Sequence, residues 1–277
     1  MALGSPSEKT LKKIIGIVLV RNEDCFVQRV VGNILEFCDR ILLVDNGSHD
    51  ATPEILRKIA ASDPGRITFH SVSHPRESHD LLKPYAGSPA WVFAVDGDEI
   101  YDPEGLARFR PRLLAGEFDR HWMILGNVHH CDALNTGAGF AEGYATPPGR
   151  SITKLYNFAA IRSWNGDTPE RLHGGEPAFL EGYDEQTKRN LQNEYTWEQA
   201  PLRCLHLCFL SRSSLDDPAT MSRENIMETY EGGWTNRLKR LLRKLRGQPE
   251  SSYWKRERYA RGERCTVSTA PFFPKAQ

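Results

Sequence analysis

The sequence lacks several features that would each define a class of protein. Its 277 residues include six cysteines but no C-x-x-C pair, which excludes a zinc knuckle and offers no disulfide framework. The longest apolar run, Ile14 to Val20, is far shorter than the roughly 20 residues that a membrane-spanning helix needs. Residues 1–13 contain no apolar segment, so we expect no secretory signal and a location in the reducing cytoplasm.

Glycine-rich nucleotide-binding signatures are also missing. The first apolar run continues into Arg21-Asn22-Glu23 and is followed by neither G-x-G-x-x-G nor G-x-x-x-x-G-K-[ST]. Any phosphorylated ligand must therefore be neutralised by something other than a glycine-rich loop.

Charge is balanced in total but uneven along the chain. Lysines and arginines number 36, as do aspartates and glutamates, yet residues 237–264 carry a net charge of +8. The remaining residues carry −8, and an acidic body is unsuited to general nucleic-acid binding. We therefore expect no nucleic-acid partner.

Apolar patterns alternate between those of strands and those of helices. Short apolar runs predict strands at 14–20, 41–44, 67–72, 90–95, 151–158 and 202–210, with a further strand at 121–129. Apolar spacing and capping residues predict a helix at 26–38, with Asp24 as its N-cap, and a second helix that begins after Thr52 as N-cap. Further helices are predicted at 103–114 and, with polar composition, at 184–199. Residues 135–150 are predicted to form a loop. This order predicts an α/β fold with a mostly parallel central sheet flanked by helices.

Ligands of such sheets bind at the carboxyl ends of the strands. The acidic pair Asp96 and Asp98 follows a predicted strand there, and Gly97 between them removes side-chain bulk so that a diphosphate could approach. Two carboxylates so placed can hold Mg²⁺ or Mn²⁺, which often share their ligands with substrate phosphates. The alternative is an ordinary surface turn, since Asp and Gly favour turns.

Three segments together resemble the family 2 glycosyltransferases of GT-A fold. They are VLVRNE at 18–23, VDNGSHDAT at 44–52 and VDGDE at 95–99. The resemblance covers about residues 14–100 and extends more loosely to about 210. It implies a Rossmann-like sheet, a nucleoside diphosphate sugar donor that is usually UDP-linked, a divalent metal, and transfer with inversion.

The resemblance also assigns residues on the donor side. Val20, Arg21 and Glu23 would line the nucleoside pocket, and Asp45 would accept a hydrogen bond from the base. Asp96 would lie near the ribose or the metal. Further assignments are Gly97 beside the diphosphate, Arg76 facing it, and Asp98 and His206 as metal ligands.

An inverting transfer needs a group that takes the proton from the acceptor hydroxyl. Glu176 is the first candidate because two glycines precede it, Asp167 is the second, and Glu170 lies in the same stretch. Trp164 is placed to stack on a sugar. His173 resembles the His-Glu element of some family members, although two glycines separate it from the glutamate here.

A basic segment follows the predicted catalytic domain. Residues 234–246 combine a leucine stripe at helical spacing with basic side chains, which predicts an amphipathic helix. We expect it to pack on the preceding domain; contact with an anionic membrane at the inner face is the alternative. The predicted organisation is a domain over 11–215, with a nucleotide half at 11–100 and an acceptor half at 101–215, and a basic helical extension over 216–277.

Two other functions compete with sugar transfer. One is a catalytically silent module that binds a nucleotide sugar, and the other is a metal-dependent nucleotidyltransferase. The latter lacks its expected glycine-rich, lysine-bearing signature near residue 20. The acceptor, whether a carbohydrate, a lipid-linked molecule or a small molecule, is not specified by the sequence, but the resemblance implies assembly of bacterial surface glycans or glycolipids.

Overall fold

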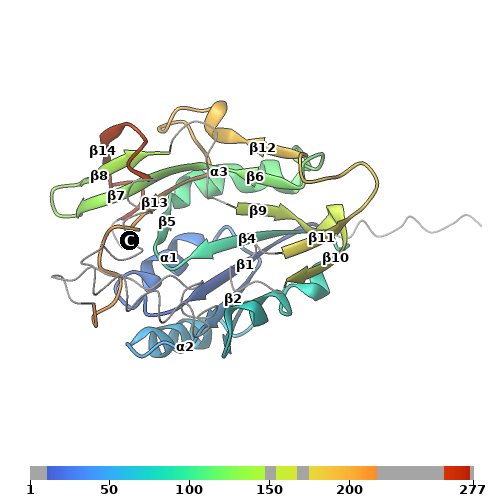
Figure 1. The fold of residues 1–277 in the computed structure, drawn as a ribbon, viewed down its shortest axis with the longest axis horizontal. Helices are drawn as coiled ribbons and strands as arrows, with labels where there is room; N and C mark the ends of the chain where they lie inside the picture. The colour runs from blue at the N-terminus through green and yellow to red at the C-terminus, as the bar shows by residue number, and fades with distance from the viewer. Residues whose placement is uncertain (1–10, 147–153, 167–174, 217–258, 275–277) are drawn as a thin grey trace, which may run out of the picture.

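A computed structural model describes residues 11–146, 154–166, 175–216 and 259–274. Its seven-stranded central sheet has the order β12-β6-β9-β4-β1-β2-β3 (Figure 1). The strands are β1 (Lys13–Val20), β2 (Arg40–Asp45), β3 (Ile67–Ser71), β4 (Ala90–Asp96), β6 (Met123–Leu125), β9 (Lys154–Asn157) and β12 (Lys188–Asn190). β1 pairs in parallel with β2 and β4, and β2 with β3, whereas β9 is antiparallel to β4 and β6. The predicted α/β fold with a mostly parallel sheet is therefore confirmed.

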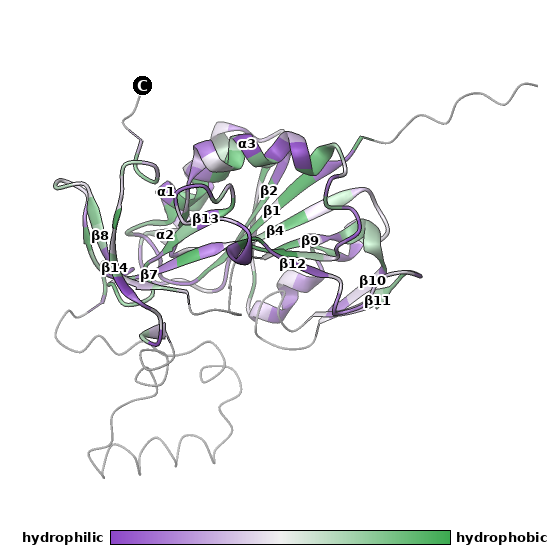
Figure 2. Cartoon of the chain, turned by 90° about the horizontal axis from the view of Figure 1, so that it is seen from above, coloured by the Kyte–Doolittle hydropathy of each residue, from purple (hydrophilic) through white to green (hydrophobic). Residues whose placement is uncertain are grey.

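The central strands are buried on both faces. Ile14 and Val18 of β1 belong to one apolar cluster, whereas Ile15 and Ile17 belong to the other. This explains the unbroken apolar run, because alternate side chains of a strand point to opposite faces. Figure 2 shows β1, β2 and β4 as hydrophobic strands at the centre, with hydrophilic and hydrophobic stretches alternating along α3.

The described α-helices are α1 (Val27–Ile34), α2 (Thr52–Ser62) and α3 (Pro103–Leu114). Two predicted caps are wrong. Asp24 does not cap α1, because its carboxylate accepts hydrogen bonds from Ser214 and from the Ala51 N–H. Thr52 is the first residue of α2, and its hydroxyl accepts the Glu23 N–H instead.

A second sheet is attached at the carboxyl end of β4. Its strands are β5 (Glu99–Tyr101), β7 (Asn127–Asn135), β8 (Phe140–Ala145), β13 (Arg203–His206) and β14 (Arg264–Ser268), in the order β14-β8-β7-β13-β5. β13 lies between β5, to which it is antiparallel, and β7, to which it is parallel. A separate ribbon pairs β10 (Ile161–Gly166) with β11 (Gly175–Phe179).

The middle of the chain departs from the predicted pattern. The predicted strand at 121–129 is split between β6 and β7, and the predicted loop at 135–150 contains β8. The predicted helix at 184–199 contains β12 and a 3-10 turn at Leu191–Asn193. Asp184 and Asn190 accept backbone N–H groups two residues ahead, which favours turns over an α-helix.

The C-terminal residues that the structure describes are part of the fold. β14 pairs antiparallel with β8, and Phe272 is fully buried in the larger apolar cluster. Within the predicted helical extension over 216–277, residues 264–268 therefore form a strand that completes the second sheet. The predicted basic helix at 234–246 lies outside the described residues. None of the helices in the described part of the chain has the length and apolar composition that crossing a bilayer requires.

Candidate active site

The carboxyl ends of β1 and β2 are joined by their turns. Asn22, in the left-handed backbone region with φ 54°, donates its N–H to Ser48 Oγ at 2.9 Å. Its side-chain oxygen accepts the His49 N–H at 2.8 Å, and the Val20 carbonyl accepts the Asn46 N–H at 2.9 Å. The two turns therefore form one hydrogen-bonded unit at the edge where ligands of such sheets bind.

Asp45, the last residue of β2, is buried at this edge. Both of its carboxylate oxygens lie 3.4 Å from the Ser48 N–H, so the side chain folds over its own turn. Arg21, on the neighbouring turn, is half-buried. The structure thus brings Val20, Arg21 and Asp45 to one edge of the sheet, as their predicted roles require.

Asp98 and His206 lie side by side although they are far apart in the sequence. The antiparallel register of β13 and β5 sets His206 opposite Glu99, and the Leu207 N–H donates to the Asp98 carbonyl at 2.8 Å. His206 Nε2 is 3.4 Å from Asp98 Oδ2, and both side chains are buried. Strand pairing therefore brings the two predicted ligands together.

Glu99 stabilises the turn that joins β4 to β5. Its Oε2 accepts the Asp96 N–H at 3.3 Å and the Tyr101 hydroxyl at 2.9 Å. Gly97 packs closely against its neighbours on the side where a side chain would project. A Cβ there would lie 2.7 Å from both Glu23 Cγ and Val20 Cγ1, so protein side chains already fill that space.

Arg212 supplies a buried positive charge that sequence reasoning missed. Its Nη1 contacts Asp98 Oδ2 and lies 3.2 Å from Glu23 Oε1, and the residue is only 8% exposed. Burial lowers the pKa of the guanidinium, but the charges of Asp98 and Glu23 outweigh this effect, so its pKa lies above the ordinary value. Glu23, predicted to line the nucleoside pocket, is buried, and its Oε1 faces the same guanidinium as Asp98.

Residues 211–216, the segment that contains Arg212, are hydrogen-bonded to the turns that follow β1 and β2. Asp24 accepts the Ser214 N–H at 2.7 Å, and Asp50 accepts the Ser213 hydroxyl at 2.7 Å. The Arg212 carbonyl accepts the Cys25 N–H at 3.0 Å. These bonds fix the backbone of Arg212 over the site.

His206 has a second close neighbour on its other side. His206 Nδ1 lies 3.1 Å from His130 Nδ1, and Cys208 Sγ lies 3.9 Å from the same atom of His130. Burial, with smaller contributions from His206 and His129, lowers the pKa of His130 to about 2. Burial likewise raises the pKa of the Cys208 thiol well above its ordinary range. No single sequence motif pointed to His130.

Comparison with protein families decides the class of the chain. Residues 17–175 match the family described as "Glycosyl transferase family 2". The chain belongs to this family. Its α/β fold with a mixed, mostly parallel central sheet agrees with the fold that the resemblance implied.

Solved structures match this family 2 chain only in part. Glucosyl-3-phosphoglycerate synthase from Mycobacterium tuberculosis, in complex with Mn²⁺, UDP and glucosyl-3-phosphoglycerate, is 19% identical with a TM-score of 0.27. The match covers 43% of this chain and 43% of the synthase. Mannose-6-phosphate isomerase from Helicobacter pylori is 13% identical with a TM-score of 0.33, over 52% of this chain and 60% of that one. No curated protein matches the sequence significantly.

The acidic site of the family 2 chain has the donor chemistry for a hard divalent cation. Glu23 and Asp98 contribute two buried carboxylates, and His206 contributes one imidazole nitrogen. Mn²⁺ and Mg²⁺ prefer carboxylate oxygens, and imidazole is acceptable to Mn²⁺. Arg212 contacts both carboxylates from one side, so the charged groups of the site lie close together.

Two other predicted residues are exposed on elements away from the strand ends described above. Arg76 is exposed in the 3-10 helix η1 (Pro75–His79), and Glu176 is exposed on β11 opposite Asn165. Trp164 is wrong as a sugar-stacking residue, because it is 1% exposed and its Nε1–H donates to His79 Nδ1 at 3.1 Å. Asp167, Glu170 and His173 lie outside the described residues.

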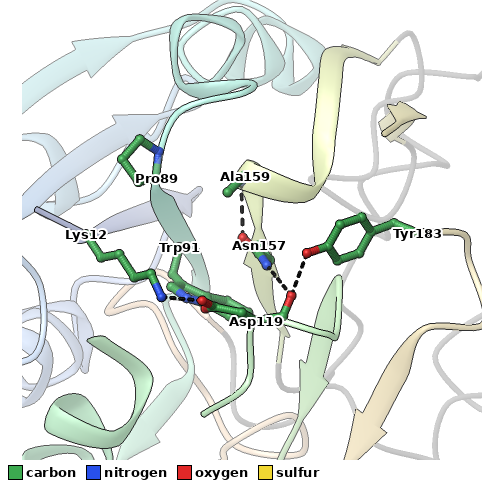
Figure 3. Close-up of a pocket in the computed structure, with 7 residues that line it drawn as sticks. All are labelled: Lys12, Pro89, Trp91, Asp119, Asn157, Ala159 and Tyr183. Carbon is green, nitrogen blue, oxygen red and sulfur yellow. Dashed lines mark hydrogen bonds and ion pairs between the residues drawn. The ribbon is translucent and has the colours of Figure 1, made fainter. Parts of the chain in front are cut away.

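A small pocket lies at the opposite, amino end of β4 (Figure 3). Lys12 and Asp119 form an ion pair across it, and the Tyr183 hydroxyl and Asn157 Nδ2 both donate to the Asp119 carbonyl. Because it lies at the other end of β4, this pocket is not part of the acidic site.

Proposed function

We propose that the chain is an inverting, metal-dependent glycosyltransferase that transfers a sugar from a UDP-linked donor to an acceptor hydroxyl. The observation that carries this proposal is the buried pair of Asp98 and His206, 3.4 Å apart at the carboxyl edge of the sheet. Membership of glycosyl transferase family 2 supports the reaction class.

Asp98 and His206 would hold Mn²⁺ or Mg²⁺, with Asp96 near the ribose or the metal. Such a cation supplies charge neutralisation for a leaving nucleoside diphosphate. Asp98 is buried and held beside β13 by the bond from the Leu207 N–H to its carbonyl, so its carboxylate is positioned before a ligand arrives. Preorganised charge of this kind costs no rearrangement at the moment of reaction.

Asp45 would hold the base of the donor. Its carboxylate lies at the carboxyl end of β2, beside the turn that contains Arg21, where it could accept a hydrogen bond from an N–H of the base. Residues 11–100 would thus form the donor half and residues 101–215 the acceptor half. Glu176 and Asp167 stay the predicted groups for removing the acceptor proton, and the basic segment 234–246 stays a predicted helix.

Release of the nucleoside diphosphate from a panel of sugar nucleotides tests this function. We expect UDP release that requires Mn²⁺ or Mg²⁺ and that falls by roughly 10²–10³-fold in Asp98→Asn, because the charge opposite the diphosphate is lost. Asp119→Asn, in the remote pocket at the amino end of β4, is the matched control and should keep full turnover.

The same assay separates the alternatives. A silent binding module would bind the donor without releasing any product. A nucleotidyltransferase would release pyrophosphate, or a sugar phosphate, in place of UDP. Either result would contradict the proposed sugar transfer.

A further inference from the structure

The two ring nitrogens of His206 face two different groups. Nε2 lies 3.4 Å from Asp98 Oδ2, on the side of the proposed cation, and Nδ1 lies 3.1 Å from His130 Nδ1. The parallel register of β13 and β7 sets His206 opposite His130, so the contact is built into the sheet. His130 is 1% exposed and His206 7%.

A contact between two Nδ1 atoms at this distance requires a proton between them. A neutral imidazole carries one N–H, and its other nitrogen is an acceptor. When His206 carries its proton on Nδ1, its Nε2 presents a lone pair toward Asp98. When the proton lies on Nε2 instead, that nitrogen cannot bind a metal.

We propose that His130 is a positioning residue that accepts the Nδ1–H of His206 and so keeps His206 Nε2 unprotonated for the divalent cation. The proposal rests on the proposed function and adds a residue to it. Metal-binding histidines usually donate their other N–H to a fixed acceptor, which sets the tautomer and the ring orientation. Here a second histidine takes that place.

Packing around His130 restricts the movement of its ring, as a fixed hydrogen-bond acceptor requires. The ring of Tyr259 stacks on it, with centroids 4.2 Å apart and planes 19° apart. The side chain is also almost fully buried, so neighbouring atoms restrict its rotation. The stacking of Tyr259 therefore holds the His130 ring in place, and the contact with His130 in turn holds the ring of His206.

Cys208 offers a competing interpretation. The donor atoms of His130, His206 and Cys208 all lie within 4.8 Å of one another, which is a set that a thiophilic metal could use. His206 would then have to bind through Nδ1 while Nε2 faces Asp98. Its Nε2 would then carry the proton and point it at Asp98, so His206 could not also bind a cation beside Asp98. The two interpretations therefore exclude each other.

The test compares two variants of the full chain. His130→Phe keeps an aromatic ring beside Tyr259 but removes the acceptor, whereas His130→Asn keeps an acceptor near the position of Nδ1. We expect His130→Phe to weaken Mn²⁺ binding by about 10–100-fold, and His130→Asn to recover part of the loss. His129→Phe, at the neighbouring position of β7, is the control and should bind Mn²⁺ like the unaltered chain.

Nitrogen NMR of histidine-labelled, metal-free protein gives a readout that a merely structural role would not move. We expect His206 to be the Nδ1–H tautomer in the unaltered chain and in His130→Asn, and to shift toward Nε2–H in His130→Phe. A predominant Nε2–H tautomer in the unaltered chain, or unchanged Mn²⁺ affinity in His130→Phe, would overturn the proposal.

Two further results have distinct meanings. A thiolate charge-transfer band with Co²⁺ that Cys208→Ser abolishes would show that the three side chains bind a metal, and would also overturn the proposal. Absence of Mn²⁺ binding to the unaltered chain would contradict the proposed function, while the tautomer of His206 would still decide whether His130 sets it.

Discussion

Arg212 is the residue on which the charge balance of the site depends. Two buried carboxylates, Glu23 and Asp98, share one guanidinium. Removing one partner of a buried ionic cluster leaves uncompensated charge, which is far more costly than losing an exposed ion pair. A divalent cation bound beside Asp98 would add to the positive charge that Arg212 supplies to this acidic site.

We predict that Arg212→Met lowers the free energy of unfolding by about 3–5 kcal/mol. Mn²⁺ should restore more stability to this variant than to the unaltered chain, because it replaces the missing positive charge. Urea denaturation with and without Mn²⁺ measures both effects. Arg264→Met, which removes an exposed ion-pair partner, is the control with little expected change. Equal stabilisation of both proteins by Mn²⁺ would contradict this view of the site.

Sequence reasoning found the residues that local motifs mark. Asp45, Asp96 and Asp98 each follow an apolar strand, and this topology places them at one edge of the sheet. Arg212 and His130 could not be found in this way, since their roles come from contacts across the second sheet and from a loop without a recognisable pattern. The prediction for Trp164 was wrong because the sequence around an aromatic residue does not show whether its ring is exposed to a sugar or buried in the core.

Among the elements, the turn from β4 to β5 depends on the absence of a side chain at Gly97. We predict that Gly97→Ala costs about 1–3 kcal/mol of stability, since the new methyl group meets Glu23 and Val20. It should also weaken Mn²⁺ binding, because Glu23 must move from its place beside Asp98.

Gly32 in α1 provides the matched substitution. A Cβ at Gly32 meets nothing within 4 Å, so Gly32→Ala should raise stability by roughly 0.5–1 kcal/mol through helix propensity alone. Thermal unfolding and Mn²⁺ titration of both variants check the prediction. A Gly97→Ala protein as stable as the unaltered chain would show that this turn can relax at no cost.

The elements that sequence reasoning predicted are those with simple periodicity. β1, β2 and β4 are apolar runs whose residues are mostly buried. Asp102, the residue before α3, caps that helix by accepting the Glu104 and Gly105 N–H groups. The helix predicted at 184–199 is wrong because the polar residues of this segment are as compatible with a solvent-facing helix as with the strand and turns found there. Its strand exists only through pairing with β6, which is information that local sequence does not contain.

At the scale of the whole molecule, the C-terminal strand closes the second sheet. The Asn33 side chain donates to the Phe272 carbonyl at 2.8 Å, and the Phe272 ring stacks on Trp197. The folded domain therefore includes residues from both ends of the described chain.

We predict that Phe272→Ala lowers the free energy of unfolding by roughly 3–5 kcal/mol, because it empties a fully buried site. Leu11→Ala, at a residue 80% exposed, is the control and should have almost no effect. Chemical denaturation measures both. Stability unaffected by Phe272→Ala would mean that the C-terminal residues contribute nothing to the folded domain.

The account as a whole depends on a cation held by Asp98 and His206 beside a nucleotide site. Calorimetric titration of UDP into the full chain with Mn²⁺, with a chelator, and into Asp98→Asn with Mn²⁺ tests this most directly. We predict binding to the unaltered chain with Mn²⁺ that is at least about tenfold tighter than in the other two titrations, a difference of ~1.4 kcal/mol. Equal UDP affinity in all three titrations would contradict it.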